Sequence, residues 1–236
     1  MLSKKSNNST NGTKVKTGDK YERILEAAVK VFARMGFFQA TISQIAKEAG
    51  VADGTIYLYF KNKDDILIQF LNYKTKQVFD LFQEEVRKRK NAEDKLRCLI
   101  HLHLAEFQRD RNTALVYQAV RRQNSPIVRE ELKEMSKTYL DLVSGIVEQG
   151  QAEGSMRKDL YLGLVKRFIL GAIEEVINTW LLSGGKYDLV SMADPLIDLF
   201  IRGIGNFEKQ PNIFPQPFES AGLNDSTGRS MGREQI

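Results

Sequence analysis

The stretch that decides the fold reads TISQIAKEAGVADGTIYLYFKNKDDIL and covers residues 41–67. It begins with Thr41 and Gln44, whose spacing is that of a capping box at the start of a helix. Apolar residues at helical spacing then run to Gly50, a residue type that commonly ends a helix. A second short helix is expected over residues 54–60. This stretch therefore predicts two short helices joined by a glycine turn.

The second of these helices, GTIYLYF, has two faces of different character. Ile56 and Phe60 can face a core, whereas Thr55, Leu58 and Tyr59 share the opposite face. Exposing large apolar side chains is costly unless that face meets a partner. A helix of this size fits the DNA major groove, where hydroxyls bind phosphates or base edges and apolar side chains touch thymine methyl groups. The pattern predicts either a helix-turn-helix or a small helical hairpin packed on its neighbours.

Helical periodicity extends from this stretch in both directions, and no long segment alternates like a half-buried strand. Upstream, Asp19 and Glu22 have capping-box spacing and open a helix that is expected to end at Gly36. Downstream, helices are expected over residues 64–90, 92–109, 112–123, 126–150, 160–182 and 189–204. The sequence predicts an all-α fold of about nine helices, with a three-helix N-terminal module followed by a C-terminal helical bundle.

Composition divides the chain into four parts. Residues 1–18 are polar and lysine-rich with nothing to bury, so we expect a disordered basic leader. Residues 19–65 hold the candidate helix-turn-helix, and residues 66–206 form a larger helical body. Residues 207–236 hold three of the five prolines and predict a second disordered tail.

The distribution of charge does not by itself establish nucleic-acid binding. The formal net charge is +5 over 236 residues, and most of it lies on the leader, so the folded body is nearly neutral. The single cysteine, Cys98, cannot form an internal disulfide, which fits a reducing cytosol. No apolar run approaches the roughly 20 residues of a membrane span, and no signal peptide is apparent. We expect a cytoplasmic protein with no membrane partner.

The order of the turn glycine, the Gly-Thr-x-Tyr-x-Tyr-Phe segment and the trailing lysine resembles the TetR family of transcriptional regulators. The resemblance continues upstream through RILEAAVKVFARMGF to about residue 21. It implies a helix-turn-helix that binds double-stranded operator DNA. By that resemblance, hydroxyl and lysine side chains would touch phosphates or a base edge and two side chains would sit in the groove. The implied DNA-binding residues are Thr41, Ser43, Thr55, Tyr57, Leu58, Tyr59 and Lys63.

The resemblance implies that residues 66–206 form the ligand-binding and dimerisation domain. This part of the chain is similar to one branch of the family, the acyl-CoA-responsive FadR repressors of fatty-acid degradation. The similar segments are RRQNS (121–125), GAIEEVINTWLLSGGKYDLV (171–190) and IRGIGN (201–206). This implies a repressor of fatty-acid degradation genes that has no cofactor and leaves its operator when a long-chain acyl-CoA binds. The alternative is a TetR-type regulator of another regulon, such as drug efflux, switched by a different hydrophobic ligand.

Aromatic and aliphatic side chains on the expected body helices are the candidates for a ligand pocket. For the acyl chain these are Phe79, Leu99, His103, Phe107, Tyr117, Tyr139 and Phe168, each of which could instead be plain core. Arg121 and Arg122 are candidates for the CoA phosphates, because guanidinium groups suit phosphates; a solvated face is the alternative. His101 and His103 are two residues apart, hence on different helix faces, so no shared metal site is expected.

The helix expected at residues 160–182 is apolar almost all round, so it must be covered on two sides. A second copy of the chain is predicted to cover one side, with the helix at 189–204 as companion, in a two-fold four-helix interface. The predicted dimer residues are Ile173, Ile177, Trp180, Leu196, Phe200 and Ile204. The alternative is a buried central helix of a monomer.

A two-fold dimer would place its recognition helices in successive major grooves, about 34–36 Å apart, on a near-palindromic operator. The lysine leader would then follow phosphates or enter a minor groove. An enzyme acting on acyl-CoA is the competing class of function. The sequence holds no glycine-rich phosphate loop, nucleophile elbow or metal-ligand spacing, so we expect no catalytic activity.

Overall fold

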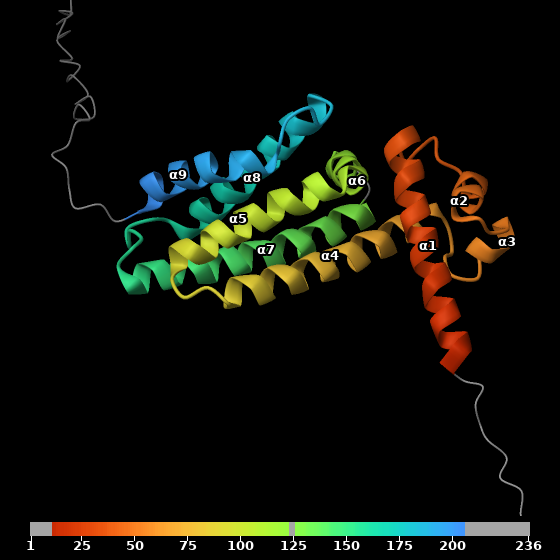
Figure 1. Cartoon of the computed structure of the whole chain (residues 1–236), viewed down its shortest axis with the longest axis horizontal. Helices are drawn as coiled ribbons and strands as arrows, with labels where there is room; N and C mark the ends of the chain where they lie inside the picture. Colours follow the sequence, from red (N-terminus) through yellow and green to blue (C-terminus); the bar gives the residue numbers. More distant parts are fainter. Residues whose placement is uncertain (1–10, 123–125, 206–236) are drawn as a thin grey trace, which may run out of the picture. The chain divides into compact units, whose positions relative to one another are not determined.

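The computed structural model describes residues 11–122 and 126–205, and the all-α prediction is confirmed over that part of the chain. Nine α-helices and one 3-10 helix, η1, account for its regular structure, with one isolated β-bridge between Met156 and Gly205. None of these helices is both long and apolar enough to cross a membrane. The helices (Figure 1) are α1 (Asn11–Met35), α2 (Ile42–Ala49), α3 (Asp53–Ile56), α4 (Lys63–Arg87), α5 (Ala92–Arg109), α6 (Arg111–Arg121), α7 (Pro126–Glu153), α8 (Leu162–Leu182), η1 (Val190–Met192) and α9 (Ala193–Ile204).

Helix α1 begins at Asn11, so the predicted helix start at Asp19 is wrong, and so is the leader boundary at residue 18. No proline interrupts residues 11–18, and a glycine in a helix interior, here Gly18, costs only about 1 kcal/mol relative to alanine. Once residues further along are fixed against the core, each added residue extends the helix at low cost. The remainder of the predicted leader, residues 1–10, and the predicted tail at 207–236 lie outside the described residues.

The start and end of α2 follow the local sequence signals. Thr41 Oγ1 accepts a hydrogen bond from the Gln44 backbone N–H at 3.3 Å, and the Gln44 side chain accepts one from the Thr41 N–H at 2.9 Å, so the capping box is confirmed. Gly50 ends the helix with φ 64°, a left-handed conformation that glycine adopts without strain. Helix α3 is shorter than the predicted 54–60, because residues 57–59 form a turn after Ile56.

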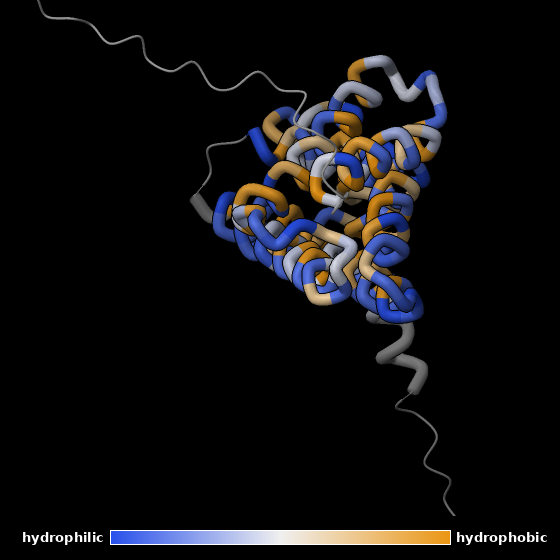
Figure 2. Tube along the Cα trace, turned by 90° about the vertical axis from the view of Figure 1, so that its left-hand side faces the viewer, coloured by the Kyte–Doolittle hydropathy of each residue, from blue (hydrophilic) through white to orange (hydrophobic). Residues whose placement is uncertain are grey.

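The buried apolar side chains form two clusters. The first, which we call the N-terminal core, joins α1, α2 and α3 to the first turns of α4 and is completed by α6 and α7 through Val116, Val120 and Val128. The second, the body core, lies among α4, α5, α7, α8 and α9, which pack against one another (Figure 1). Along the chain trace, hydrophobic and hydrophilic positions alternate around the helices (Figure 2). Helix α4 contributes to both clusters: its first half to the N-terminal core and its second half to the body core.

The six predicted dimer residues belong to the body core of the single chain, which leaves little of them exposed to a second chain. All six are at most 8% exposed in the single chain: Ile173, Ile177, Trp180, Leu196, Phe200 and Ile204. A side chain that is already covered by its own chain offers no surface to a second one. Periodicity identified an apolar helix correctly but did not say which of its sides the neighbouring helices would take.

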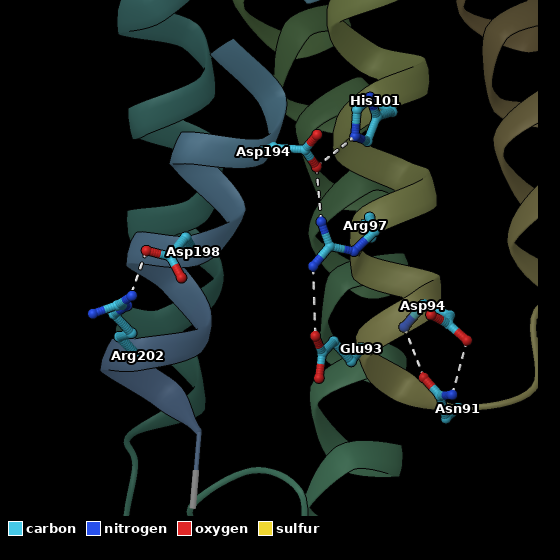
Figure 3. Close-up of polar contacts among 8 residues, drawn as sticks. All are labelled: Asn91, Glu93, Asp94, Arg97, His101, Asp194, Asp198 and Arg202. Carbon is cyan, nitrogen blue, oxygen red and sulfur yellow. Dashed lines mark hydrogen bonds and ion pairs between the residues drawn. The ribbon is translucent and has the colours of Figure 1, made fainter. Parts of the chain in front are cut away.

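A polar cluster on the surface ties α9 to α5 (Figure 3). Asp194 Oδ1 accepts from Arg97 Nη1 at 2.7 Å and lies 3.0 Å from His101 Nε2, while Arg97 also lies 3.5 Å from Glu93. The His101 hydrogen bond and then Arg97 hold the pKa of the Asp194 carboxyl below its ordinary value. The cluster is exposed, so its role is to align the two helices rather than to contribute much stability.

Candidate DNA-binding surface and ligand cavity

The segment after α2 has the two faces expected of a recognition helix. Ile56 and Phe60 are buried in the N-terminal core, whereas Tyr57 is 59% exposed and Leu58 is 81% exposed. Thr55 is half-buried between these faces. Large apolar side chains with this exposure are what a helix needs in order to touch base edges and thymine methyl groups.

Tyr59 differs from its two exposed neighbours because its ring packs against the module. Its ring centroid lies 6.4 Å from that of Tyr21 on α1 and 6.3 Å from that of Phe60. It is therefore half-buried. Tyr59 helps to hold α3 against α1, so its predicted place in the groove would use only part of the side chain.

The two predicted hydroxyl contacts on α2 are already engaged within the protein. Thr41 is the capping residue of the helix, and its oxygen accepts from Gln44. The Ser43 hydroxyl donates to the Asp53 carboxylate, which links α2 to the first residue of α3. Both hydroxyls are exposed. Each therefore has a structural role, and DNA contact by either remains a prediction.

Lys63, predicted to hold a phosphate, has an internal role that the sequence did not reveal. Its Nζ donates to the carbonyl oxygens of Phe38 at 3.0 Å and Ala40 at 2.8 Å, and it lies 4.7 Å from the centroid of the Phe37 ring. An ammonium group has three N–H donors. The side chain thus ties the α1–α2 connection to the first residue of α4, and at most one donor is left for a phosphate.

The body holds a cavity between α4, α5, α6, α7 and α8. Its cavity volume is about 90 Å³ and it is partly open to solvent, so it is smaller than the roughly 300–1,000 Å³ of typical ligand sites. Its lining is mostly aromatic and aliphatic. The lining residues are Phe70, Leu71, Lys74, Thr75, Val78, Phe79, Phe82, His103, Glu106, Phe107, Asp110, Thr113, Tyr117, Met135, Ser136, Tyr139 and Leu170.

Five predicted ligand residues come together in this lining: Phe79, His103, Phe107, Tyr117 and Tyr139. Their rings are in mutual contact. The His103 centroid lies 5.0 Å from that of Tyr139 and 5.3 Å from that of Phe107, and the Phe107 centroid lies 5.5 Å from that of Tyr117. The five residues therefore form one continuous aromatic wall rather than separate parts of a core.

The other four predicted ligand residues do not line the cavity. Leu99 is fully buried in the body core, and Phe168 is 59% exposed on α8 with its ring against Phe200. Arg121 forms an ion pair with Glu174 and lies over the Tyr117 ring at 5.8 Å, while Arg122 donates to the Asn178 side chain at 2.8 Å. Both arginines join α6 to α8: Glu174 balances the charge of Arg121, and Asn178 accepts one hydrogen bond from Arg122.

The residues missed from the sequence lie mostly on α4. Leu71, Thr75, Val78 and Phe82 recur at helical spacing and share the face that lines the cavity. A threonine within an otherwise apolar stripe was the available signal, because a buried hydroxyl needs a partner. At one edge of the cavity, Lys74 Nζ lies 3.3 Å from Asp110 Oδ2.

Two polar side chains in the aromatic wall are almost fully buried, and burial governs their protonation. Burial, and then the Arg121 charge, lowers the pKa of His103 to about 3, and burial raises the pKa of Tyr139. Both side chains are therefore neutral at physiological pH. Within the described part of the chain, no group of three or more acidic, histidine or cysteine side chains is arranged to hold a metal ion.

An exposed strip that is mostly apolar, interrupted by Glu175 and Thr179, runs along α8 and continues onto α9. Leu164 is 64% exposed, Phe168 59%, Leu182 75% and, on α9, Leu199 67%. Those on α8 are spaced as residues of one helical face, opposite the buried Ile173. The chain itself thus covers the side of α8 with Ile173 and leaves the opposite side exposed.

Comparison with known proteins agrees with both parts of the molecule. Residues 24–70 match bacterial regulatory proteins of the tetR family, and residues 71–203 match the C-terminal region of YsiA-like proteins. The fatty acid metabolism regulator protein of Bacillus subtilis (strain 168) is 40% identical over 187 residues, which cover 79% of this chain and 96% of that protein.

Two solved structures extend this agreement to the fold. The fatty acid degradation regulator FadR from Bacillus halodurans superposes with a TM-score of 0.76 at 36% identity, covering 78% of this chain and 95% of that one. The transcriptional regulator FadR from Bacillus subtilis, in complex with stearoyl-CoA, superposes with a TM-score of 0.74 at 39% identity, covering 78% and 99%.

Proposed function

Because the chain belongs to the TetR family of bacterial transcriptional regulators, we propose that it is a repressor of fatty-acid degradation genes that long-chain acyl-CoA releases from its operator. Similarity to a fatty acid metabolism regulator, and to a FadR structure that holds stearoyl-CoA, supports this effector. The protein acts by binding rather than by catalysis, in the bacterial cytoplasm where its operator is.

One observation carries the switching mechanism: the cavity and the N-terminal core share side chains. Phe70 and Leu71 on α4 are buried in the N-terminal core and also line the cavity. Tyr117 on α6 and Met135 on α7 line the cavity and pack against the same core. A ligand that fills the cavity therefore presses on side chains that position the recognition helix.

The required coupling is modest. Helix α4 begins at Lys63, which is bonded to the α1–α2 connection, so a shift of α4 moves the whole module. A coupling of about 1–3 kcal/mol lowers operator affinity by roughly 5- to 150-fold. By linkage, operator DNA lowers the affinity for acyl-CoA by the same factor.

A homodimer completes the mechanism. The exposed strip of Leu164, Phe168, Leu182 and Leu199 is the surface that we assign to the two-fold interface, in place of the six buried residues. Helices α8 and α9 of two chains would form a four-helix contact. The two recognition helices would then read a near-palindromic operator in successive major grooves, about 34–36 Å apart.

The test is release of a preformed complex. Operator fragments selected from random duplexes by binding to the full chain are labelled, and acyl-CoAs of increasing chain length are titrated while fluorescence anisotropy is followed. Long-chain acyl-CoA should release the DNA at lower concentration than short-chain acyl-CoA, and CoA alone should not release it. Release by another lipophile, with none by acyl-CoA of any length, would overturn the fatty-acid assignment and favour a regulator of another regulon.

A further inference from the structure

Three side chains in the cavity wall carry buried polar atoms that the described residues leave without a hydrogen-bond partner: Thr75, His103 and Tyr139. Two of these atoms, Nδ1 of His103 and the hydroxyl of Tyr139, belong to the aromatic wall. His103 is 8% exposed and Tyr139 is 3% exposed, so bulk water does not reach them freely. Both residues line the cavity, and their ring centroids are 5.0 Å apart at an interplanar angle of 65°.

This pair is unusual for its surroundings. An unsatisfied buried donor or acceptor is destabilising, and natural proteins keep such groups mainly where they have a role. The neighbouring rings are apolar: Phe82 lies 5.8 Å from His103 and 6.3 Å from Tyr139, and Phe79 lies 6.4 Å from Tyr139. Two polar atoms in an aromatic cage that could be built from phenylalanine alone point to a polar atom on the ligand.

The chemistry of the pair restricts what that atom can be. Both groups are neutral, so they can donate hydrogen bonds but cannot balance a buried charge. The tyrosine O–H is one donor, and neutral His103 with its hydrogen on Nδ1 is a second. Two neutral donors on neighbouring rings suit a carbonyl oxygen, which has two lone pairs.

We infer that His103 and Tyr139 together bind the thioester carbonyl oxygen of the effector, an inference that rests on the proposed function. The thioester oxygen is the only strong hydrogen-bond acceptor at the acyl end of a saturated acyl-CoA. Binding it at this pair places the start of the acyl chain against Phe79 and Phe82 and leaves the rest of the apolar lining for the chain. The pair thereby makes the cavity selective for a thioester and not only for an aliphatic chain.

The experiment compares two ligands that differ at one atom. Palmitoyl-CoA has the thioester carbonyl, and S-hexadecyl-CoA has a CH₂ group in its place. For each ligand, the concentration that releases half of the operator is measured by anisotropy. The wild-type protein should need about 10-fold more of the thioether, because the thioether leaves two buried donors unsatisfied.

The variant Tyr139→Phe should reduce this ratio to about 3-fold or less, and His103→Phe should reduce it similarly. A purely structural role for either residue would change both ligands equally and leave the ratio unaltered. Tyr117→Phe is the matched control, since it removes a hydroxyl from the same cavity and should keep the ratio of the wild type.

The possible failures are distinct. If palmitoyl-CoA does not release the wild-type protein, the proposed function is overturned and this inference with it. If palmitoyl-CoA releases the protein but Tyr139→Phe and His103→Phe keep the wild-type ratio, only the inference is overturned. A wild-type ratio near one also overturns it, since the carbonyl would then contribute nothing.

Discussion

The N-terminal core and the body core are both built from helices, but they place their candidate binding residues in opposite positions, outside in the first and inside in the second. The buried side chains of the N-terminal core are apolar, and Tyr57 and Leu58 are on the outside. In the body core the arrangement is reversed, because His103 and Tyr139 are buried and the cavity is inside. A rigid DNA duplex can be bound only by side chains on the protein surface. An aliphatic chain is stabilised most when it is removed from water, so its binding site belongs in the interior.

The two regions also differ in their exposed apolar side chains and cavities. Beside the N-terminal core, Tyr57 and Leu58 are exposed, and the body has both a cavity and the exposed strip along α8 and α9. Each of these features corresponds to one partner in the proposed function: DNA, effector and second chain. Perturbing these features separately tests whether each one binds the partner proposed for it.

The largest effect is expected for the strip. Leu164→Glu with Phe168→Glu places two charges on side chains that are 64% and 59% exposed, so the monomer should fold normally. The dimer should dissociate, and operator affinity should fall more than about 100-fold because two half-sites are no longer linked. Sedimentation velocity and anisotropy measure the two effects. The conservative pair Leu164→Met with Phe168→Leu should behave as wild type, and a charged variant that stays dimeric would show that the interface lies elsewhere.

A smaller effect is expected at the recognition segment. Tyr57→Ala with Leu58→Ala should lower the preference for operator over random duplex by about 10- to 100-fold, or roughly 1–3 kcal/mol. The melting temperature should hardly change, because both side chains are exposed. Ile56→Ala, at a fully buried neighbour, should instead cost about 2–5 kcal/mol of folding stability. Unchanged operator preference in the first variant would mean that this segment does not read the DNA.

The buried histidine should make stability depend on pH. The pKa of His103 is lowered to about 3 in the folded protein and is about 6.5 when unfolded, so the unfolded chain binds the extra proton between these values. Stability is therefore retained above pH 6.5 and lost as pH falls, by about 2 kcal/mol at pH 5. Urea unfolding at pH 7.5 and pH 5 measures this loss.

The two histidines of the chain provide a matched pair for that measurement. His103→Phe should remove most of the loss between pH 7.5 and pH 5, since no buried imidazole remains to resist protonation. His101→Gln, on the exposed cluster with Asp194, should retain it. Equal pH dependence in both variants would show that acid sensitivity arises outside the cavity.

The smallest effect is expected at Lys63. Lys63→Met keeps the aliphatic stem but removes two charge-assisted hydrogen bonds, to Phe38 and Ala40, and should cost about 1–2 kcal/mol of stability. The salt dependence of operator binding should stay as in wild type. The exposed Lys61→Met is the control for loss of one positive charge. A salt slope reduced by about one with unchanged stability would instead assign Lys63 to a phosphate.

Features that depend on neighbouring residues in the chain were predictable. The capping box of Thr41 and Gln44 and the left-handed Gly50 are decided by side chains within one helical turn, and the structure has both. The exposure of Leu58 and the burial of Ile56 agree with the faces predicted from helical spacing, whereas Tyr59, predicted to share the face of Leu58, is half-buried. The resemblance to a known family then added the DNA-binding role that geometry had left open against a plain hairpin.

Features that depend on which helices pack together were not predictable. Five of nine predicted ligand residues line the cavity, but aromatic character did not distinguish Phe168 on the surface from Phe79 inside. Arg121 satisfies its charge with Glu174, more than fifty positions away in the sequence. A polar residue's partner is chosen by the tertiary fold, so its freedom to bind a ligand cannot be known from its identity.

Helix α8 shows most clearly which properties depend on the packing of other helices. Its residue pattern alone predicts that α8 is apolar on nearly every side and needs covering on two sides. Packing within the fold buries the side with Ile173 and Ile177 and leaves the side with Leu164 and Phe168 largely exposed, although the Phe168 ring contacts Phe200. Burying either side of α8 would remove apolar area from water, and the hydrophobic effect has no direction that favours one side. The lengths and connections of the surrounding helices therefore decide which side is buried.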